Sequence, residues 1–532
     1  MCERSAVVRT GVLVAAVAVV AAVETALGAA ALAWPRATLA PSQTALTQVK
    51  LPWFAGRIVA VEVRGPGGEA VPVSIRGAHI WPRGRLGSGE RLAVTVTVRR
   101  PGYAGWLVGR TDTETFAVET PSAHLRARWL EVKDGTRVAV AFDTAVSRVK
   151  LQGGHPKVVA ATAVVPVGVT AEGRTSAGSV EVSAAARTWE RLPAPTRVSW
   201  FPSRSYPQVL PSPAAGVRIA PNALLSLTFS RPVASVLGRL RPTLVPATPG
   251  RWRIADSHTI TFRPSGLGYG FGSTVHVRLP APAHLAGRPM LVRTISWTVA
   301  SGSTLRLQQL LAGLGYLPVT WHERSDPPAS DVVYQLAASL YPPAGTFSWR
   351  YPHTPATLKA LWQPGRWNVI TQAAVMAFEN DHHLPVDGAA SPSLWQALLT
   401  SALTGDTPKS GYSYVYVHAT IPETLDLWRD GRVILTSPGN TGIPGAPTAY
   451  GTYPVFEHIP VGTMSGTNPD GSHYVDPGIQ WISYFHGGDA IHAFPRASYG
   501  TPQSLGCVEL PFDAAAKAWP YTPIGTLVTV QS

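Results

Sequence analysis

A chain of 532 residues is too long for one hydrophobic core, so we expect several domains, roughly three to five. Only 14% of the residues are charged, whereas glycine and proline contribute 49 each, a composition typical of many short strands joined by turns. The net charge of +14 rests on scattered arginines without a cationic block. This pattern argues against a nucleic-acid-binding protein and favours attraction to an anionic surface.

The N-terminal segment, residues 1–40, has the pattern of an export signal. Two arginines precede an apolar run from Gly11 to Val23, and small residues follow at Ala31 and Ala33, the spacing that a signal peptidase reads. The apolar character then resumes, so an uncleaved membrane anchor of about 20 residues is the alternative. In either case we expect the rest of the chain outside the cytoplasm.

The two cysteines lie at opposite ends of the chain. Cys2 precedes the apolar run, so it cannot pair with Cys507 in the exported protein. A lone thiol in an oxidising compartment is a liability unless it is buried or used. Burial is the usual fate of a free cysteine, and a catalytic role is the alternative that the neighbouring residues must decide.

Residues 41–301 predict tandem β-modules. The stretches RLAVTVTVRR, TRVAVAF and GSVEVSA alternate apolar and polar residues, and glycine and proline turns separate them, as in β-sandwiches. Proline-rich breaks divide the region into β-sandwich modules at 41–120 and 121–210 and a third module at 211–301, which resembles the immunoglobulin-like repeats of bacterial surface proteins. The polar residues of this region do not form the kind of cluster that a catalytic site needs. We therefore expect the three modules to act as spacers, with a role as a binding module as the alternative.

Residues 302–405 change to helical periodicity. STLRLQQLLAGLGYLPV places leucines on one helical face before Gly315, and NVITQAAVMAFENDHHLPVDG and SPSLWQALLTSAL predict two more helices. An insertion after Pro318 separates the first helix from the others. These elements resemble the three-helix peptidoglycan-binding domain. The residues that carry the resemblance are Leu307, Gln308, Leu311, Leu314, Gly315, Tyr316, Ala374, Val375, Phe378, Asp387, Gly388, Trp395 and Leu398. The adjacent His382 and His383 have no partner at metal-ligand spacing.

The C-terminal segment, residues 410–532, returns to strands. YSYVYVHA alternates, LDLWRDGRVIL predicts a hairpin around Asp430-Gly431, and GTLVTVQS predicts a closing strand. In GDAIHAFPRASYGTPQSLGCVEL, His492 precedes Cys507, which suggests a base and a nucleophile. Gly506 allows a tight turn in which consecutive N–H groups point at one oxygen. A nearby histidine can lower the pKa of a thiol, so we expect a Cys507 thiolate near neutral pH.

These residues resemble the catalytic domain of the L,D-transpeptidases of the YkuD type. The matching positions are Pro447, Thr448, Gly451, Tyr453, Ile491, His492, Ser504, Gly506, Cys507, Val508 and Leu510. The resemblance implies that Cys507 is the nucleophile, that His492 is the base oriented by the carbonyl of Ala493, and that the N–H groups of Gly506 and Cys507 hold the oxyanion. The implied mechanism needs no metal or organic cofactor. The expected substrate-binding residues are Ser504, Arg496, Tyr484 and Glu509.

Three positions depart from the family pattern. Ala493 replaces a glycine, which leaves the orienting carbonyl in place, and Leu505 replaces a histidine near the thiol. Glu509 replaces an arginine, and its carboxylate would raise the pKa of the thiol and repel an acidic peptide. Arg496 could offset this charge. Alternatively, Glu509 points to solvent, since neighbouring residues of a strand face opposite sides.

The whole chain is therefore expected to be multidomain and mainly β, with tandem β-sandwich modules, a small three-helix domain and a β-rich catalytic domain. The resemblance implies an enzyme at the cell wall or the outer face of the membrane. It would form a Cys507 thioester with a peptidoglycan stem peptide, release D-alanine and transfer the acyl group to an amine. Its partners would be stem peptides and glycan. An L,D-carboxypeptidase and a catalytically decayed scaffold are the alternatives.

Overall fold

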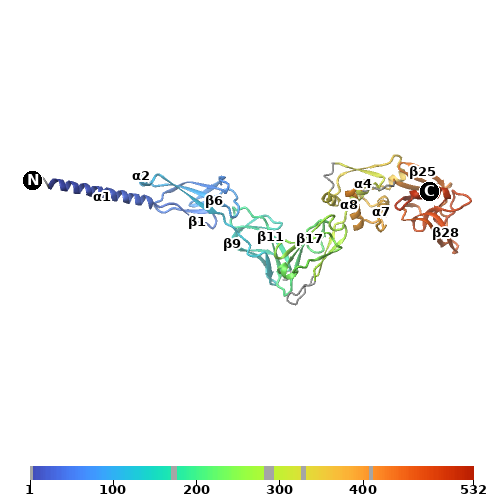
Figure 1. Cartoon of the computed structure of the whole chain (residues 1–532), viewed down its shortest axis with the longest axis horizontal. Coiled ribbons are helices and arrows are strands. Elements are labelled where there is room, and N and C mark those ends of the chain that lie inside the picture. Colours follow the sequence, from blue (N-terminus) through green and yellow to red (C-terminus); the bar gives the residue numbers. More distant parts are fainter. Residues whose placement is uncertain (1–3, 169–175, 281–292, 325–330, 406–410) are drawn as a thin grey trace. The chain divides into compact units, whose positions relative to one another are not determined.

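The computed structural model describes residues 4–168, 176–280, 293–324, 331–405 and 411–532. The protein is mainly β, as its composition predicts (Figure 1). It divides into two compact units, Met1–Leu210 and Pro211–Ser532, and each is described by itself.

The first unit begins with one long helix, α1 (Arg4–Leu32), formed by the apolar N-terminal segment (Figure 1). In the part of the chain that the structure describes, no helix combines the length and apolarity needed to cross a membrane. The signal peptide and the membrane anchor therefore stay predictions.

Two sheets follow α1. The first has the order β1-β2-β5-β4, with the bounds β1 (Thr38–Ala40), β2 (Thr47–Lys50), β5 (His79–Pro82) and β4 (Val73–Arg76). The second has the order β3-β6-β7, with the bounds β3 (Arg57–Arg64), β6 (Arg91–Arg99) and β7 (Thr111–Glu119), and α2 (Gly105–Val108) lies between the last two strands. The stretch RLAVTVTVRR forms β6 as predicted. Its alternate residues Leu92, Val94, Val96 and Val98 are buried, which gives this strand a core-facing side.

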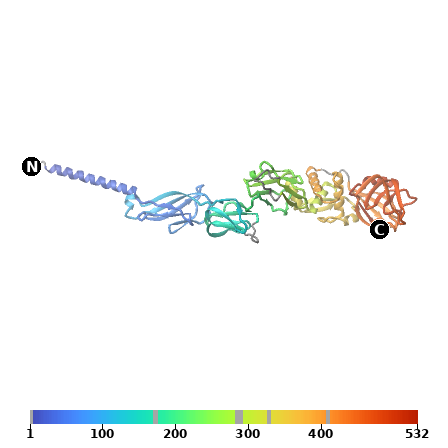
Figure 2. The same ribbon diagram turned by 90° about the horizontal axis from the view of Figure 1, so that it is seen from below.

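The next strands of the first unit form one five-stranded sheet in the order β10-β9-β11-β12-β8. Their bounds are β8 (Trp129–Val132), β9 (Val138–Leu151), β10 (Lys157–Gly168), β11 (Gly178–Ala185) and β12 (Thr196–Pro202). The residues VAVAF of the stretch TRVAVAF begin β9, and GSVEVSA lies in β11, as expected. Figure 2 draws this part of the chain in cyan to teal. The segment between β11 and β12 packs back on the first module, because Trp189 is part of that module's core and its indole N–H donates to the Thr44 carbonyl at 2.8 Å.

The second unit begins with two four-stranded sheets. One has the order β13-β15-β18-β17, with β13 (Val209–Ser212), β15 (Leu225–Phe229), β18 (Thr259–Pro264) and β17 (Gly250–Ile254). The other has the order β14-β20-β19-β16, with β14 (Arg218–Ile219), β20 (Thr294–Val299), β19 (Thr274–Arg278) and β16 (Thr243–Val245). The short helix α3 (Val233–Val236) follows β15. Large apolar side chains of both sheets are fully buried, among them Leu227, Ile260 and Trp297.

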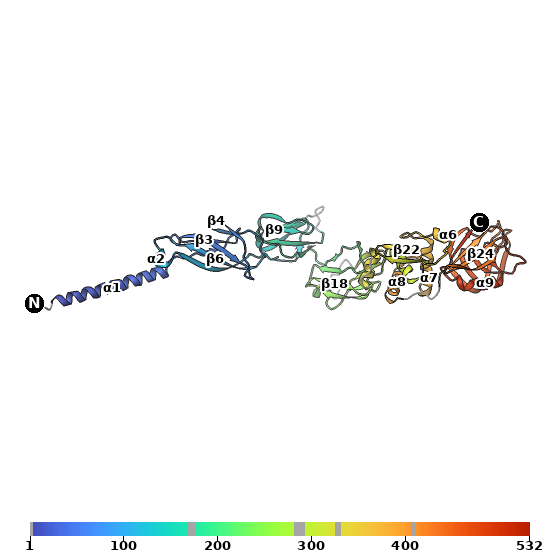
Figure 3. The same cartoon turned by 90° about the horizontal axis from the view of Figure 1, so that it is seen from above.

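The three helices expected in residues 302–405 are present as α4 (Thr304–Leu314), α7 (Val369–Asp381) and α8 (Pro392–Thr404). Figure 1 labels all three, and Figure 3 shows α7 and α8 from another side. Gly315 ends α4 in the left-handed conformation, and the Ser391 hydroxyl caps α8 by accepting a bond from the Leu394 N–H. The insertion after Pro318 adds structure that the sequence pattern did not predict. It forms β21 (Val319–Glu323), α5 (Val332–Leu340), β22 (Gly345–Trp349) and α6 (Ala356–Ala360).

The last segment contains two sheets. The first has the order β25-β24-β23-β31-β26, with β23 (Ser413–His418), β24 (Thr424–Arg429), β25 (Arg432–Pro438), β26 (Gly451–Pro454) and β31 (Leu527–Gln531). Asp430 and Gly431 join β24 to β25 with φ of 46° and 98°, which confirms the predicted hairpin. The second has the order β27-β28-β29-β30, with β27 (Glu457–Thr467), β28 (His473–His486), β29 (Asp489–Ala493) and β30 (Val508–Leu510). The helix α9 (Phe512–Ala518) and the 3-10 turn η1 (Trp519–Tyr521) follow β30.

One apolar core joins the helices of residues 302–405 to the first of these two sheets. Leu311 of α4 and Phe378 of α7 belong to the same buried cluster as Tyr414, Trp428 and Leu527 of the sheet. Hydrogen bonds accompany the packing, since the Trp428 indole donates to the His353 carbonyl at 3.2 Å. The two regions therefore share a core, although the sequence pattern predicted separate domains.

Candidate active site

The register of two strands brings the candidate base and the candidate nucleophile together. Strands β29 and β30 run parallel, with Ile491 opposite Val508 and His492 opposite Glu509. Cys507 directly precedes β30, so it lies on the same side of the ladder as Glu509 and close to Ala490. Residues fifteen positions apart in the sequence thus lie on neighbouring strands at one end of the sheet.

The Cys507 thiol is free and the residue is partly exposed. Its Sγ donates to the Gly488 carbonyl at 3.7 Å. Burial of the sulfur raises the pKa of the thiol to about 12, a bond from the Ala490 backbone acts in the opposite direction, and the charges of Asp489 and Glu509 raise it further. The sequence-based expectation of a thiolate near neutral pH is wrong for this resting arrangement, because desolvation outweighs any help from a histidine.

His492 is 3% exposed, and its Nδ1 lies 3.0 Å from the carbonyl oxygen of Ala493. When Nδ1 donates this bond, the lone pair is on Nε2, the arrangement that a general base needs. Burial lowers the pKa of His492, so the ring is neutral near pH 7. The carbonyl of Ala493 thus lies where the resemblance implies an orienting group, and the substitution of a glycine by alanine leaves this contact intact.

The turn that carries the thiol is held by Ser504. Its hydroxyl donates to the Cys507 carbonyl at 2.6 Å and accepts a bond from the Gly506 N–H at 3.2 Å. The Thr448 hydroxyl lies 3.5 Å from the same Cys507 carbonyl. The Gly442 N–H donates to the Thr448 hydroxyl at 2.8 Å. Ser504 is 2% exposed. This geometry favours a positioning role for Ser504 over the substrate contact expected from the sequence.

Gly506 is required in this turn for two reasons. Its φ is +114°, a region that residues with a side chain rarely adopt, and a Cβ here would overlap Oδ1 of Asp489. The same carboxylate accepts a bond from the Ala449 N–H at 3.1 Å and lies 3.5 Å from Nδ1 of His486. Asp489 therefore links the 447–449 turn to the end of β28 and lies against the cysteine turn. We did not identify Asp489 from the sequence, where its place three residues before the base was the available signal.

Glu509 does not point to solvent. Its side chain is 5% exposed and forms a two-point ion pair with Arg496, from Nε to Oε2 at 2.8 Å and from Nη2 to Oε1 at 2.7 Å. Arg496 also donates to the Gln503 carbonyl at 3.1 Å. The solvent-facing alternative for Glu509 is wrong, and Arg496 occupies the partner position that the sequence suggested. The pair clamps the loop after β29 against β30.

Two tyrosines of β28 lie near the thiol. Tyr484 packs in the same small apolar cluster as Cys507, and a Cys507 thiolate would raise the pKa of both Tyr484 and Tyr474 further, after burial as the larger cause. Both residues belong to the long β27–β28 hairpin, whose tip is the Asn468–Ser472 turn. Tyr484 was expected from the sequence, whereas Tyr474 was not. The NPDG turn between two alternating stretches was the signal for this hairpin.

Among the described residues, no group of three or more histidine, cysteine, aspartate and glutamate side chains could hold a metal ion.

Comparison with known families decides the kind of domain. The model of the L,D-transpeptidase catalytic domain, YkuD, matches residues 414–530. These residues form a YkuD domain. The YkuD domain contains every candidate site residue described above, and the peptidoglycan-binding and immunoglobulin-like modules stay predictions.

Solved structures that resemble this chain include three L,D-transpeptidases. The Mycobacterium smegmatis L,D-transpeptidase is 15% identical with a TM-score of 0.21, covering 61% of this chain and 100% of that one. The catalytic domain of the E. faecium L,D-transpeptidase is 25% identical with a TM-score of 0.21, covering 23% and 100%. L,D-transpeptidase 3 from Mycobacterium tuberculosis is 12% identical with a TM-score of 0.21, covering 61% and 98%. No curated protein matches the chain. The assignment of residues 414–530 rests on the family model.

Proposed function

We propose that the protein is a cell-wall L,D-transpeptidase that uses Cys507 as its nucleophile and His492 as its general base. The observation that carries the proposal is the YkuD match over residues 414–530, together with the fixed Nδ1 contact of His492 within that domain. The substrate would be a peptidoglycan stem peptide that ends in D-alanine. The protein would act outside the cytoplasm, where this polymer lies.

The first step begins from a neutral thiol and a neutral imidazole, because burial raises the pKa of Cys507 and lowers that of His492. The thiol proton passes to Nε2 of His492 as Sγ attacks the carbonyl carbon of the third stem residue. The carbonyl oxygen becomes an oxyanion. The imidazolium then gives its proton to the D-alanine nitrogen, the C–N bond breaks, and an acyl thioester remains on Cys507.

The oxyanion needs at least one aimed N–H donor. Among the described residues, no hydrogen bond of the Cys507 N–H is found, so this group is available. The Gly506 N–H is engaged with the Ser504 hydroxyl at 3.2 Å and becomes available only if that long bond opens. We therefore assign the main donor role to Cys507 and a secondary one to Gly506.

The second step transfers the acyl group. His492 accepts a proton from the amine of a second stem peptide, the amine nitrogen attacks the thioester carbon, and the sulfur leaves and recovers a proton. The product is a cross-link between two stems. With water in place of the amine, the same residues perform an L,D-carboxypeptidase reaction.

The test is intact-mass spectrometry of the protein after incubation with a synthetic tetrapeptide stem. We expect an adduct of the mass of the tripeptide acyl group on the peptide that carries Cys507, together with free D-alanine. Cys507→Ala removes the adduct, because the nucleophile is absent. Addition of a second stem should convert the adduct to a cross-linked dimer, whereas a carboxypeptidase releases only the tripeptide.

A second candidate is a wall-binding scaffold without turnover. The contact of Sγ with the Gly488 carbonyl and the raised pKa of the thiol favour it. Absence of both adduct and D-alanine release, in a protein that still sediments with purified cell wall, would support this candidate and refute the enzyme.

A further inference from the structure

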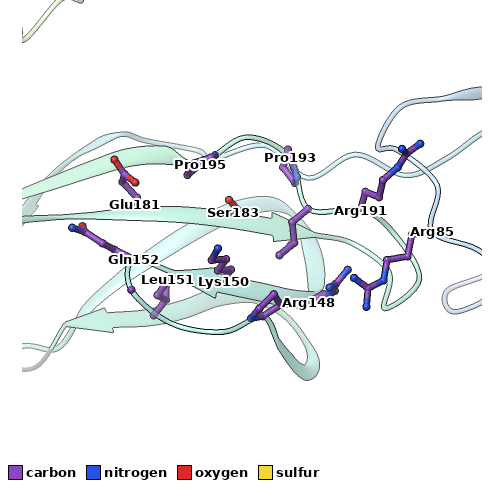
Figure 4. Close-up of a pocket in the computed structure, with 13 residues that line it drawn as sticks. Arg85, Arg148, Lys150, Leu151, Gln152, Glu181, Ser183, Arg191, Pro193 and Pro195 are labelled. Carbon is purple, nitrogen blue, oxygen red and sulfur yellow. The ribbon is translucent and has the colours of Figure 1, made fainter. Parts of the chain in front are cut away.

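A cavity of about 480 Å³ opens in the five-stranded sheet region of the first unit (Figure 4). Arg148 and Lys150 are two positions apart on β9, and Ser183 of β11 is paired with Lys150, so these side chains share one face of the sheet. The segment from Arg191 to Pro195 lines another side of the cavity. The cavity lies in a different unit from the YkuD domain and plays no part in its chemistry.

Arg85 is brought to the cavity from the preceding module by a fixed contact. Its neighbour Leu86 is buried and forms a bridge with Glu190, and the Arg191 N–H donates to the Leu86 carbonyl at 2.7 Å. Figure 4 shows the guanidinium groups of Arg85 and Arg148 side by side. The chain therefore holds two like charges close together.

Arg148 is the most informative residue of the cavity. It is 6% exposed, and its Nη1 donates to the Glu190 carbonyl at 2.8 Å. A guanidinium has five N–H donors, yet among the described residues Arg148 has no second hydrogen bond and no ion pair. Burial, and to a lesser extent the charge of Arg85, lower the pKa of Arg148. Because Arg148 lines the cavity, its remaining N–H donors are available to a ligand there.

The acidic groups nearby do not neutralise these cations. Glu181, which lines the cavity, lies 3.9 Å from Arg197, and Arg191 is paired with Glu90 at 3.2 Å. The Glu190 carboxylate accepts a bond from the Ala186 N–H rather than from Arg148. Within the described chain, Arg85, Arg148 and Lys150 thus have no carboxylate partner.

We propose that this cavity binds a phosphate group carried on a small polar body such as glycerol or a sugar. A phosphate monoester has three terminal oxygens and nearly two negative charges near pH 7, which suits two guanidinium groups, one ammonium group and the Ser183 hydroxyl. A carboxylate has two oxygens and one charge, so it would leave donors unused. The volume exceeds that of a phosphate alone and leaves room for the attached body.

The test is isothermal titration calorimetry of the full chain with sn-glycerol 3-phosphate at low salt. We expect measurable binding, and we expect Arg85→Ala and Lys150→Ala each to weaken it about tenfold, which corresponds to about 1.4 kcal/mol. Arg137→Ala is the matched control, because Arg137 is an exposed arginine of the same module that does not line the cavity. It should leave binding unchanged.

Arg148 is buried, so the binding of Arg148→Gln is interpreted only if its thermal unfolding curve shows that it folds. If Arg148→Gln does not fold, the double variant Arg85→Ala/Lys150→Ala replaces it in the test. No binding of glycerol 3-phosphate by the native chain, or an equal loss in Arg137→Ala, overturns the proposal.

Two further probes define the chemistry and the source of the phosphate. Glycerate has the same body with a carboxylate, and we expect it to bind at least tenfold more weakly; equal binding overturns the preference for phosphate. Vesicles of neutral lipid with phosphatidic acid test a lipid headgroup as the source. Co-sedimentation that depends on Arg85 and Lys150 supports a lipid source. Binding of glycerol 3-phosphate without co-sedimentation supports a soluble phosphate ester.

Discussion

The ion pair between Arg496 and Glu509 should hold together the end of the second sheet that carries Cys507. Arg496→Ala removes the two contacts with Glu509 and the bond to the Gln503 carbonyl. It leaves a carboxylate that is 95% buried without a counter-charge, since its side chain is only 5% exposed. We therefore expect a loss of stability in the YkuD domain, and not only a change at the surface.

The magnitude follows from the burial of the two partners. Removal of one partner of a buried ion pair costs 3–5 kcal/mol, and the Arg496 side chain is 30% exposed, so we expect the lower end, about 3 kcal/mol. A loss of this size corresponds to a change of more than a hundredfold in an opening equilibrium. The double variant Arg496→Ala/Glu509→Gln should recover part of the stability, because it leaves no buried charge.

The measurement is hydrogen exchange of the full chain, followed by mass spectrometry of peptides that cover β29 and β30. The slowest amides of these strands should exchange about a hundredfold faster in Arg496→Ala. Arg432→Ala is the matched control, since Arg432 is an exposed arginine of the same domain. Equal exchange in the two single variants would refute the idea that the pair stabilises the site, as would a double variant less stable than Arg496→Ala.

Three further predictions concern buried groups. Burial raises the pKa of Glu379 to about 7, so the native protein should lose about 3 kcal/mol of stability as pH rises from 4.5 to about 7. Glu379→Gln should abolish this dependence of the unfolding free energy on pH, measured by urea unfolding. An unchanged dependence in the variant would contradict the assignment. Gly506→Ala should cost roughly 1–3 kcal/mol in thermal unfolding and slow acylation, because of its positive φ and the overlap with Asp489; a native melting curve and acylation rate would argue against this turn. Iodoacetamide labelling of Cys507 should rise with pH well above neutrality, and Asp489→Asn should shift the curve to lower pH more than Glu509→Gln does; superimposable curves would show that neither charge reaches the sulfur.

Local features of the C-terminal segment could be predicted from the sequence, because they depend on short motifs. The Asp430-Gly431 hairpin is confirmed, and the parallel pairing of β29 with β30 places Cys507 and His492 on neighbouring strands, while their catalytic roles stay predictions. The orientation of Glu509 was also open to a strand argument, yet the pattern left two faces possible. Only the folded structure shows that the Glu509 side chain is buried and paired with Arg496.

The remaining features depend on contacts between distant segments, which periodicity does not encode. The raised pKa of Cys507 comes from burial and from the charges of Asp489 and Glu509, and Asp489 also accepts a bond from the distant Ala449 N–H. The structured insertion after Pro318 has short strands and helices whose core partners lie elsewhere in the chain. Arg148 gave no signal at all, because a lone arginine in an alternating strand is usually on a solvated face.

The common core of the helices and the first sheet of the YkuD domain has a consequence for how this chain can be divided. Tyr414, Trp428 and Leu527 of this sheet are buried in one core with apolar residues of α4, α7 and the inserted segment. A fragment that begins at residue 411 would expose this surface to water and invite aggregation. The helical segment and the sheets of the YkuD domain therefore fold as one unit. A recombination event that replaced only one of them would have to preserve the apolar residues on both sides of their interface.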